Sequence, residues 1–348
     1  MTTQRQSTRK LTAIDLFCGC GGLTAGLKIA GYKVLSAIEL DPKACETYAL
    51  NHPEVSLVEG DIRNVSPEDL MRDLGLRRGD LDLLAGCPPC QGFSRIRKRN
   101  KSHSARDSRN ALIDEFGRFV LTFRPKLIMM ENVPGLLDYY RFKNFRALLE
   151  AEGYQVELKI LDVADFGVPQ RRKRLIISAS RLGYPIMARP FSKRRTVRDA
   201  IGKMPVAGLS GDALHDFPEK RSDKIKDLIK AVPKNGGSRS QLPAKFALAC
   251  HQRSDGFSDV YGRMSWDDVA PTITSGCINP SKGRFLHPTE NRTITLREAS
   301  ILQGFSVRYR FNIQHGKECI ALMIGNALPP PFIAAQAKAL ANTIIEKS

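Results

Sequence analysis

The 348-residue sequence has no uninterrupted apolar stretch long enough to span a bilayer, so a membrane-spanning bundle is not the expected architecture. The opening segment "MTTQRQSTRK" lacks an apolar core, which favours a polar tail over a signal peptide. Internal repeats and long low-complexity runs are also absent, and the apolar fraction of 42% is that of a globular protein. We therefore expect a cytoplasmic protein whose eight cysteines are reduced thiols rather than a disulfide framework.

Acidic residues are scarce beside basic ones, since 36 Asp and Glu stand against 54 Lys and Arg and the net charge is +18. Basic chains commonly bind polyanions, because each neutralised phosphate releases condensed counterions. A soluble surface with an excess of charge is the alternative interpretation. The balance favours a nucleic-acid partner.

Short apolar runs alternate with amphipathic segments through the first half of the chain. The runs predicted to be buried strands are LTAIDLF (11–17), KVLSAIEL (33–40), LDLLAG (81–86), KLIMMEN (126–132) and RLIISAS (174–180). Helical spacing lies between them, at 20–31, 42–52 and 141–153. This alternation predicts an α/β fold with a doubly wound, mostly parallel sheet.

The composition changes near Ser192, where Pro, Gly, Ser and charged residues become more frequent and strand patterns fewer. Helical apolar segments return at 295–305 and 329–348. We therefore predict a first α/β domain at 1–191, a second, smaller domain at 192–292, and a C-terminal segment at 293–348 that returns to the first domain.

A glycine-rich turn, "DLFCGCGG" (15–22), follows the first strand and opens a helix. Gly19, Gly21 and Gly22 would let the backbone approach a ligand, and the helix N-terminus offers free N–H groups. An ordinary tight turn is the alternative interpretation. Glu39, at the end of the next strand, could accept from ribose hydroxyls, and Asp61 could hold an adenine amino group. Together they favour a nucleoside cofactor.

Two cysteines separated by two prolines, Cys87 and Cys90 in "GCPPCQGFS" (86–94), allow three interpretations. With Cys18 and Cys20 they could form a four-thiolate zinc site, although the prolines remove N–H groups that normally orient such thiolates. They could form a redox pair, but a polar basic loop follows instead of an amphipathic helix. The third interpretation makes Cys90 a nucleophile presented by a rigid turn and Cys87 a packing residue.

A basic run follows this turn. It contains Arg95, Arg97, Lys98, Arg99, Lys101, Arg106 and Arg109. Such a run is usually a solvated face, but beside a nucleophile it could lower the pKa of the thiol and grip phosphates as a flap.

These segments resemble a known family, the DNA (cytosine-5)-methyltransferases, from about residue 12 to 335 and more thinly at 200–260. The six matching motifs stand in the family's usual order: DLFCGCGG (15–22), GCPPCQGFS (86–94), ENVPGLL (131–137), FGVPQRRKR (166–174), RTITLREASILQGF (292–305) and GNALPPP (325–331). The resemblance implies a class I methyltransferase fold whose second domain recognises the target.

The resemblance implies a role for each matching position. Cys90 would be the nucleophile, Glu131 would hold the cytosine at N3 and its amine, and Arg172 and Arg174 would grip its O2 side and order Glu131. The cofactor would be S-adenosylmethionine, with no metal, and its site would be formed by Phe17, Gly19, Gly21, Gly22, Glu39, Leu40, Asp61, Ile62, Pro89, Leu112 and Asn326. Leu40 stands where the family often has a larger side chain against the adenine.

The implied chemistry explains these residue types. Carbon 5 of cytosine becomes nucleophilic enough to take a methyl group when the Cys90 thiolate adds at carbon 6 and Glu131 stabilises charge at N3. Because both carbons lie inside a base-paired stack, the nucleotide must be flipped out. The basic run would close behind it.

Duplex DNA is the expected partner, because residues 192–292 are long enough for a DNA-reading module. The predicted DNA contacts are Gln91, Ser94, Arg95, Arg97, Lys98 and Arg99 from the turn and its basic run, with Arg239, Arg253 and Arg263, alongside Gln252 and Asn279, as candidate base readers. We expect a monomer associated with the nucleoid, and a separately acting restriction endonuclease would be compatible with this function. The alternatives are a transfer-RNA cytosine-5 methyltransferase, a catalytically silent DNA-binding homologue, and a nicotinamide-dependent oxidoreductase of the same fold class.

Overall fold

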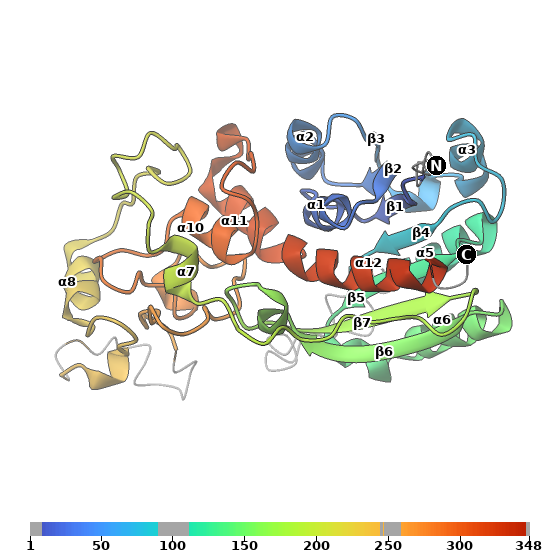
Figure 1. Cartoon of the computed structure of the whole chain (residues 1–348). Helices are drawn as coiled ribbons and strands as arrows, with labels where there is room; N and C mark the ends of the chain where they lie inside the picture. Colours follow the sequence, from blue (N-terminus) through green and yellow to red (C-terminus); the bar gives the residue numbers. More distant parts are fainter. Residues whose placement is uncertain (1–8, 90–110, 244–245, 247–258, 346–348) are drawn as a thin grey trace, which may run out of the picture.

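The computed structural model describes residues 9–89, 111–243, 246 and 259–345. Figure 1 shows a sheet flanked by helices and, beside it, a smaller lobe built largely from the segments between about 190 and 326. The two ends of the described chain lie near the same end of the sheet, opposite the smaller lobe (Figure 1).

The sheet has seven strands in the described part of the chain, in the order β3-β2-β1-β4-β5-β7-β6. Their bounds are β1 (Thr12–Leu16), β2 (Lys33–Glu39), β3 (Ser56–Glu59), β4 (Leu83–Gly86), β5 (Leu127–Asn132), β6 (Gln155–Asp162) and β7 (Lys173–Ser180). The first five pair in parallel, and β7 lies antiparallel between β5 and β6. The predicted doubly wound, mostly parallel sheet is confirmed.

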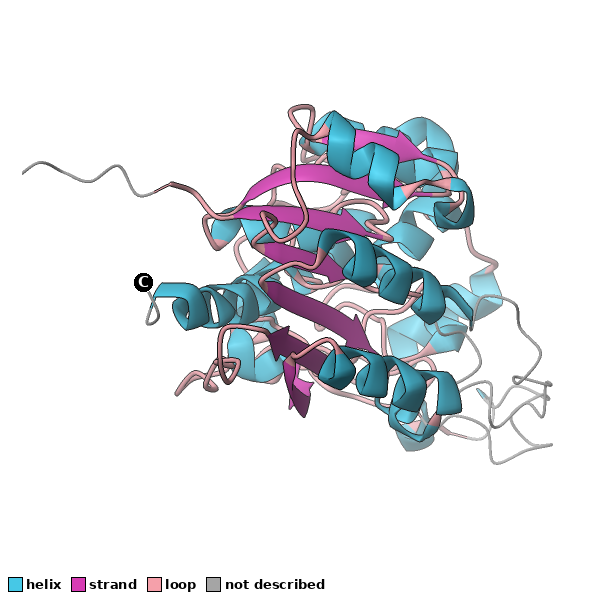
Figure 2. Cartoon of the chain, turned by 90° about the vertical axis from the view of Figure 1, so that its right-hand side faces the viewer, coloured by secondary structure: helices cyan, strands magenta, loops and turns pink. Residues whose placement is uncertain are grey.

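Helices cover both faces of this sheet, as Figure 2 shows. The helices near the sheet are α1 (Gly22–Ile29), α2 (Pro42–Asn51), α3 (Pro67–Asp73), α5 (Leu112–Phe123), α6 (Tyr140–Ala151) and α12 (Pro330–Ile345). Those of the smaller lobe are α7 (Val197–Ile201), α8 (Asp223–Ala231), α10 (Leu296–Leu302) and α11 (Gly316–Asn326). Local capping fixes several starts: the Asp41 side chain accepts from two N–H groups of α2, and Thr295 forms a capping box with Glu298 on α10.

Helix α12 returns to the sheet and packs against α1 (Figure 1). The stretch Ile313–Ile345, which includes α11 and α12, is long and apolar enough to cross a membrane by length and composition alone. However, 61% of its most apolar window is buried inside the protein, where Phe332, Ile333 and Leu340 join the core of one sheet face. Its apolar surface is therefore used for packing.

Three large hydrophobic clusters hold the molecule together. One lies on each face of the sheet, and the third joins the smaller lobe. The third contains residues from Val197 to Phe285 together with residues from Ile294 to Ile324. The core of the smaller lobe therefore continues across position 292, and the return to the sheet is made by α12.

Candidate active site

A cavity of about 510 Å³ opens where β1, β2, β4 and β5 end. Parallel strands bring their carboxyl ends to one edge of the sheet, where ligands of doubly wound folds bind. The predicted residues that line the cavity are Phe17, Gly19, Glu39, Leu40, Asp61, Ile62, Pro89, Leu112, Glu131, Arg172, Arg174 and Asn326. Segments up to 309 residues apart in the sequence thus meet at one site, between Phe17 and Asn326.

The glycine turn is held to the second strand by Glu39. Its Oε2 accepts from the Gly19 N–H at 2.8 Å, and its Oε1 accepts from the N–H groups of Leu40 and Asp41, both at 2.9 Å. Phe17 and Gly19 have left-handed backbone, with φ of 62° and 54°. A Cβ atom on Gly19 would meet no atom within 4 Å, so the backbone there faces open space.

Gly21 and Gly22, predicted to contact the cofactor, are not among the residues that line the cavity. A Cβ atom on Gly21 would lie 2.6 Å from the His52 ring, and one on Gly22 would lie 2.4 Å from the Leu328 carbonyl oxygen. These two glycines make room for close packing beneath the turn. The sequence could not separate this use from ligand contact, because both need a residue without a side chain.

Asp61 lies at the rim of the cavity and forms an ion pair with Arg63. Hydrogen bonds from the Arg63 side chain and N–H group lower the pKa of Asp61. The carboxylate is therefore charged at neutral pH and available to accept from a ligand. Arg63 itself lines the cavity, a position that the sequence analysis did not single out.

Glu131 is the penultimate residue of the fully buried strand β5 and is 3% exposed. Its Oε1 lies 2.7 Å from Arg174 Nε, and its Oε2 accepts from the Cys87 thiol at 2.9 Å. Despite this ion pair, Oε1 has no hydrogen-bond partner within the described residues. The structure thus brings Glu131 and Arg174 together as predicted, and it adds Cys87, which was expected only to pack.

Arg172 is buried, and its guanidinium bridges two other parts of the chain. Its Nη1 donates to the carbonyl of Ile273 at 3.0 Å and to that of Gly325 at 2.9 Å. Burial lowers its pKa to about 9. Its Nε is buried without a hydrogen-bond partner within the described residues.

Most of the predicted DNA contacts lie outside the described residues. These are Gln91, Ser94, Arg95, Arg97, Lys98, Arg99 and Arg253, and the predicted nucleophile Cys90 lies outside as well. Arg239, in the short helix Arg239–Gln241, is described and half-buried.

The prediction that Arg263 reads bases is wrong. Its side chain is 0% exposed, so it cannot reach a DNA groove. Its guanidinium donates to backbone carbonyls of Ile229, Val232, His287 and Glu290 and to the Asn291 side chain. A buried guanidinium needs such a set of acceptors, and here it joins three segments of the smaller lobe.

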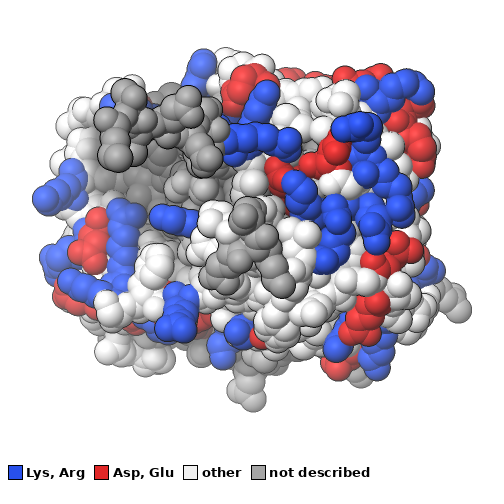
Figure 3. All heavy atoms as spheres, turned by 45° about the vertical axis from the view of Figure 1, so that its right-hand side comes forward, with Lys and Arg blue, Asp and Glu red and all other residues white. Residues whose placement is uncertain are grey.

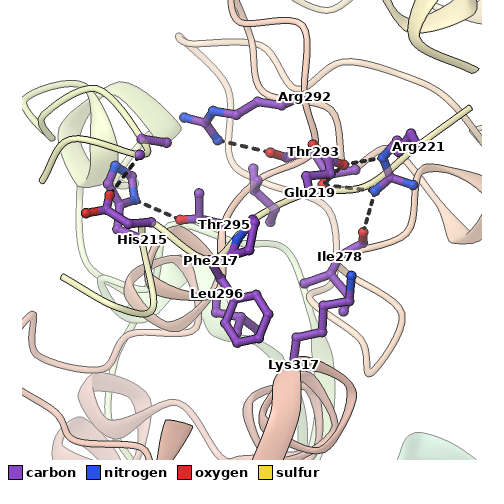
Figure 4. Close-up of a pocket in the computed structure, with 15 residues that line it drawn as sticks. His215, Phe217, Glu219, Arg221, Ile278, Arg292, Thr293, Thr295, Leu296 and Lys317 are labelled. Carbon is purple, nitrogen blue, oxygen red and sulfur yellow. Dashed lines mark hydrogen bonds and ion pairs between the residues drawn. The ribbon is translucent and has the colours of Figure 1, made fainter. Parts of the chain in front are cut away.

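A smaller cavity of about 240 Å³ lies in the smaller lobe (Figure 4). Arg221 points toward Glu219, Thr293 and the Ile278 carbonyl, and Thr293 also donates to Glu219 at 2.9 Å. Many of its polar groups are thus bonded to one another. Residues 292–296 of the motif RTITLREASILQGF line this cavity, but none of the predicted site residues does, and the larger cavity is the candidate active site.

Comparison with known proteins shows which family the chain resembles. The chain matches the family described as C-5 cytosine-specific DNA methylase over residues 11–342. It is 36% identical over 330 residues to the Type II methylase M.HgiDII of Herpetosiphon aurantiacus, with 91% of each chain covered. It is 33% identical over 338 residues to the Type II methyltransferase M1.HphI of Haemophilus parahaemolyticus, with 95% of this chain and 86% of that protein covered.

Solved structures show the same architecture. A putative DNA modification methyltransferase encoded within an E. coli prophage is similar with a TM-score of 0.69 and 25% identity, covering 97% of this chain and 100% of that one. The Dnmt2 methyltransferase of S. pombe is similar in fold with a TM-score of 0.61 and 20% identity, covering 97% and 99%.

Proposed function

The chain belongs to the C-5 cytosine-specific DNA methylase family and is a DNA (cytosine-5)-methyltransferase, and from this premise we propose its mechanism. It transfers the methyl group of S-adenosylmethionine to carbon 5 of a cytosine flipped out of a specific duplex sequence. The reaction passes through a covalent adduct with Cys90.

The observation that carries this proposal is the buried carboxylate of Glu131 at the cavity. Glu131 is 3% exposed, its Oε1 has no hydrogen-bond partner within the described residues, and Arg174 lies beside it. A carboxylate oxygen can accept from more than one donor, so Oε1, which is paired only with Arg174, can also accept from a ligand. The exocyclic amine of cytosine provides such a donor.

The residues of the cavity fit S-adenosylmethionine. A volume of about 510 Å³ lies in the usual range for a cofactor site. Glu39 would accept from the ribose hydroxyls and Asp61 from the adenine amine, while Leu40, an apolar side chain that is 62% exposed, would lie against the adenine. When bound, the cofactor supplies a methyl group on a positively charged sulfur.

The protein groups then have complementary tasks. The Cys90 thiolate adds to carbon 6 of the ring, a proton delivered by Glu131 neutralises the negative charge that develops at N3, and electron density moves to carbon 5. Carbon 5 takes the methyl group, and its proton then passes to a solvent water as the bond between carbon 6 and sulfur breaks. The thiolate is returned unchanged. Arg174 holds Glu131 throughout.

The DNA duplex must open at the target base for this reaction. Because the reacting carbons lie inside the base stack, the target nucleotide has to leave it. The net charge of +18 supports binding to phosphates, and Figure 3 shows Lys and Arg side chains spread over one face, with Asp and Glu between them. The basic run at 95–109 would close over the flipped base, and residues 192–292 would choose the sequence.

The test combines two variants with a trapping substrate. Cys90→Ser and Glu131→Gln should each lose methyl transfer to duplex DNA by ~10³-fold or more, while folding and cofactor binding persist. DNA carrying 5-fluorocytosine at the target should form a stable adduct with the wild-type protein, because no proton can leave carbon 5. An active Cys90→Ser variant, or methylation of transfer RNA in preference to duplex DNA, would refute the proposal.

A further inference from the structure

Side-chain hydrogen bonds continue the pairing of β4 with β5 beyond the last backbone partners of these two strands. The parallel register pairs Gly86 with Met130, so the next positions in step are Cys87 and Glu131. There the Cys87 Sγ donates to Glu131 Oε2 at 2.9 Å. A side-chain contact thus takes the place of the next step of the ladder.

At the next pair of positions, Pro88 and Asn132, a side chain again makes the contact between the two strands. Asn132 Nδ2 donates to the Pro88 carbonyl at 2.9 Å. Pro88 and Pro89 have no N–H group, so the backbone alone cannot continue the ladder here. The base of the diproline turn is therefore fastened to the end of β5 by two side-chain hydrogen bonds, one of which uses the Glu131 carboxylate.

The Cys87 thiol is suited to donate a hydrogen bond and unsuited to act as a nucleophile. Burial, followed by the charge of Glu131, raises the pKa of the Cys87 thiol well above its ordinary value. The thiol therefore keeps its proton at neutral pH, and a protonated thiol is a hydrogen-bond donor and a poor nucleophile.

The two oxygens of Glu131 are thus held differently. Oε2 accepts from Cys87, whereas Oε1 pairs with Arg174 and has no hydrogen-bond partner within the described residues. Without a donor on Oε2, the carboxylate could turn about its last torsion, because such torsions have broad energy wells. Catalytic groups need to be held within roughly 0.5 Å of their working position.

We propose that Cys87 is a positioning residue for methyl transfer, whose thiol holds Oε2 of Glu131 so that Oε1 is presented to the cytosine ring. This inference rests on the proposed function, because it assumes that Glu131 contacts the flipped base. It gives the two cysteines of "GCPPCQ" separate tasks: Cys87 orients the carboxylate, and Cys90 attacks the ring.

The test compares Cys87→Ala, which removes the donor, with Cys87→Ser, which keeps one. In single-turnover reactions at saturating DNA and cofactor, Cys87→Ala should transfer methyl ~10-fold more slowly, and Cys87→Ser should stay within ~3-fold of wild type. The affinities for DNA and cofactor should be unchanged in both. Cys277→Ala, which removes a fully buried thiol of the smaller lobe, is the matched control and should keep the wild-type rate.

A spectroscopic measurement tests the contact directly. The infrared S–H stretching band of Cys87, assigned from the difference between wild type and Cys87→Ser, should have the low frequency of a hydrogen-bonded thiol. It should move to higher frequency in Glu131→Gln, because a neutral amide is a weaker acceptor than a carboxylate. This measurement also decides the matter if Cys87→Ala fails to fold.

The outcomes separate the two proposals. A wild-type rate in Cys87→Ala, an equal loss in the Ala and Ser variants, or a band insensitive to Glu131→Gln would overturn the role of Cys87. If Cys90→Ser is inactive in the same experiments, the proposed function survives that result. If Cys90→Ser retains activity, the proposed function fails whatever Cys87 does.

Discussion

Arg172 Nη1 donates to the carbonyl of Gly325 at 2.9 Å, and this bond joins the start of β7 to the end of α11. The same nitrogen donates to Ile273 in the smaller lobe. A Cβ atom on Gly325 would lie 2.3 Å from the backbone nitrogen of Ser275, so the chain of the smaller lobe lies directly on this glycine. Asn326, the next residue, lines the cavity. The cavity wall and the smaller lobe are thus fixed to one buried guanidinium.

Replacing Arg172 with Lys should weaken this junction. A single ammonium group cannot reproduce the planar fork, so at least one of the carbonyls of Ile273 and Gly325 would lose its partner, at a cost of ~1–3 kcal/mol. We expect a lower unfolding temperature and a cofactor affinity reduced by ~5-fold or more, measured by thermal unfolding and by titration. Arg171→Lys is the control, because the Arg171 side chain is 53% exposed. Equal behaviour of the two variants would show that Arg172 does not join these parts.

Arg263→Ala should act on stability and not on sequence choice. Its removal would leave the buried carbonyls of Val232, His287 and Ile229 without this donor, and each buried acceptor left unsatisfied costs ~1–3 kcal/mol of folding free energy. Urea unfolding measures this loss, with Arg308→Ala, an exposed residue of the same lobe, as control. A variant of wild-type stability that methylates new sequences would contradict the buried role.

The strands and the larger cavity could be predicted because their causes are local. Strands β4 and β5 are buried on both faces, so they appear in the sequence as continuous apolar runs. Glu39 and Glu131 stand at the ends of such runs, and parallel pairing brings those ends together. Strand β6 was missed because its residues are exposed or half-buried and give no apolar run.

The use of individual side chains could not be predicted in the same way. An arginine buried among carbonyls and an arginine aimed at guanine have the same neighbours in a sequence, which is why Arg263 was assigned wrongly. The contact of Cys87 with Glu131 depends on the register between two strands that are separated along the chain by 40 residues, 87–126. Only the assembled sheet fixes that register.

Sequence choice should depend on arginines within residues 192–292 that remain candidates for base contact. Arg239→Ala and Arg253→Ala should each relax the methylated sequence at one position, by ~5–150-fold, because a bidentate contact to guanine is worth ~1–3 kcal/mol. Sequencing of 5-methylcytosine at base resolution in DNA methylated by each variant measures the change, and Arg308→Ala is again the control. If substitutions within 95–110 change the sequence and these do not, recognition belongs to the turn that carries Cys90.

The last prediction concerns Asp15, a fully buried carboxyl beneath the glycine turn. Its Oδ2 accepts from Thr24 Oγ1 at 2.7 Å, whereas its Oδ1 has no partner within the described residues. Burial raises its pKa from 3.8 to about 7. Between these two pH values the folded protein binds more protons than the unfolded chain, so this carboxyl makes the folded state less stable as the pH rises toward 7.

Asp15→Asn removes this titration while keeping the shape and an acceptor for Thr24. The stability of the variant relative to wild type should therefore increase with pH, by on the order of 3 kcal/mol between pH 5 and pH 8. Urea unfolding at several pH values measures the difference. Asp80→Asn is the control, because a backbone hydrogen bond from Arg77 lowers the pKa of Asp80 and its titration lies below this range. A difference between Asp15→Asn and wild type that stays constant from pH 5 to pH 8 would mean that Asp15 is charged in the folded protein throughout, and that the polar groups around the glycine turn stabilise its anion.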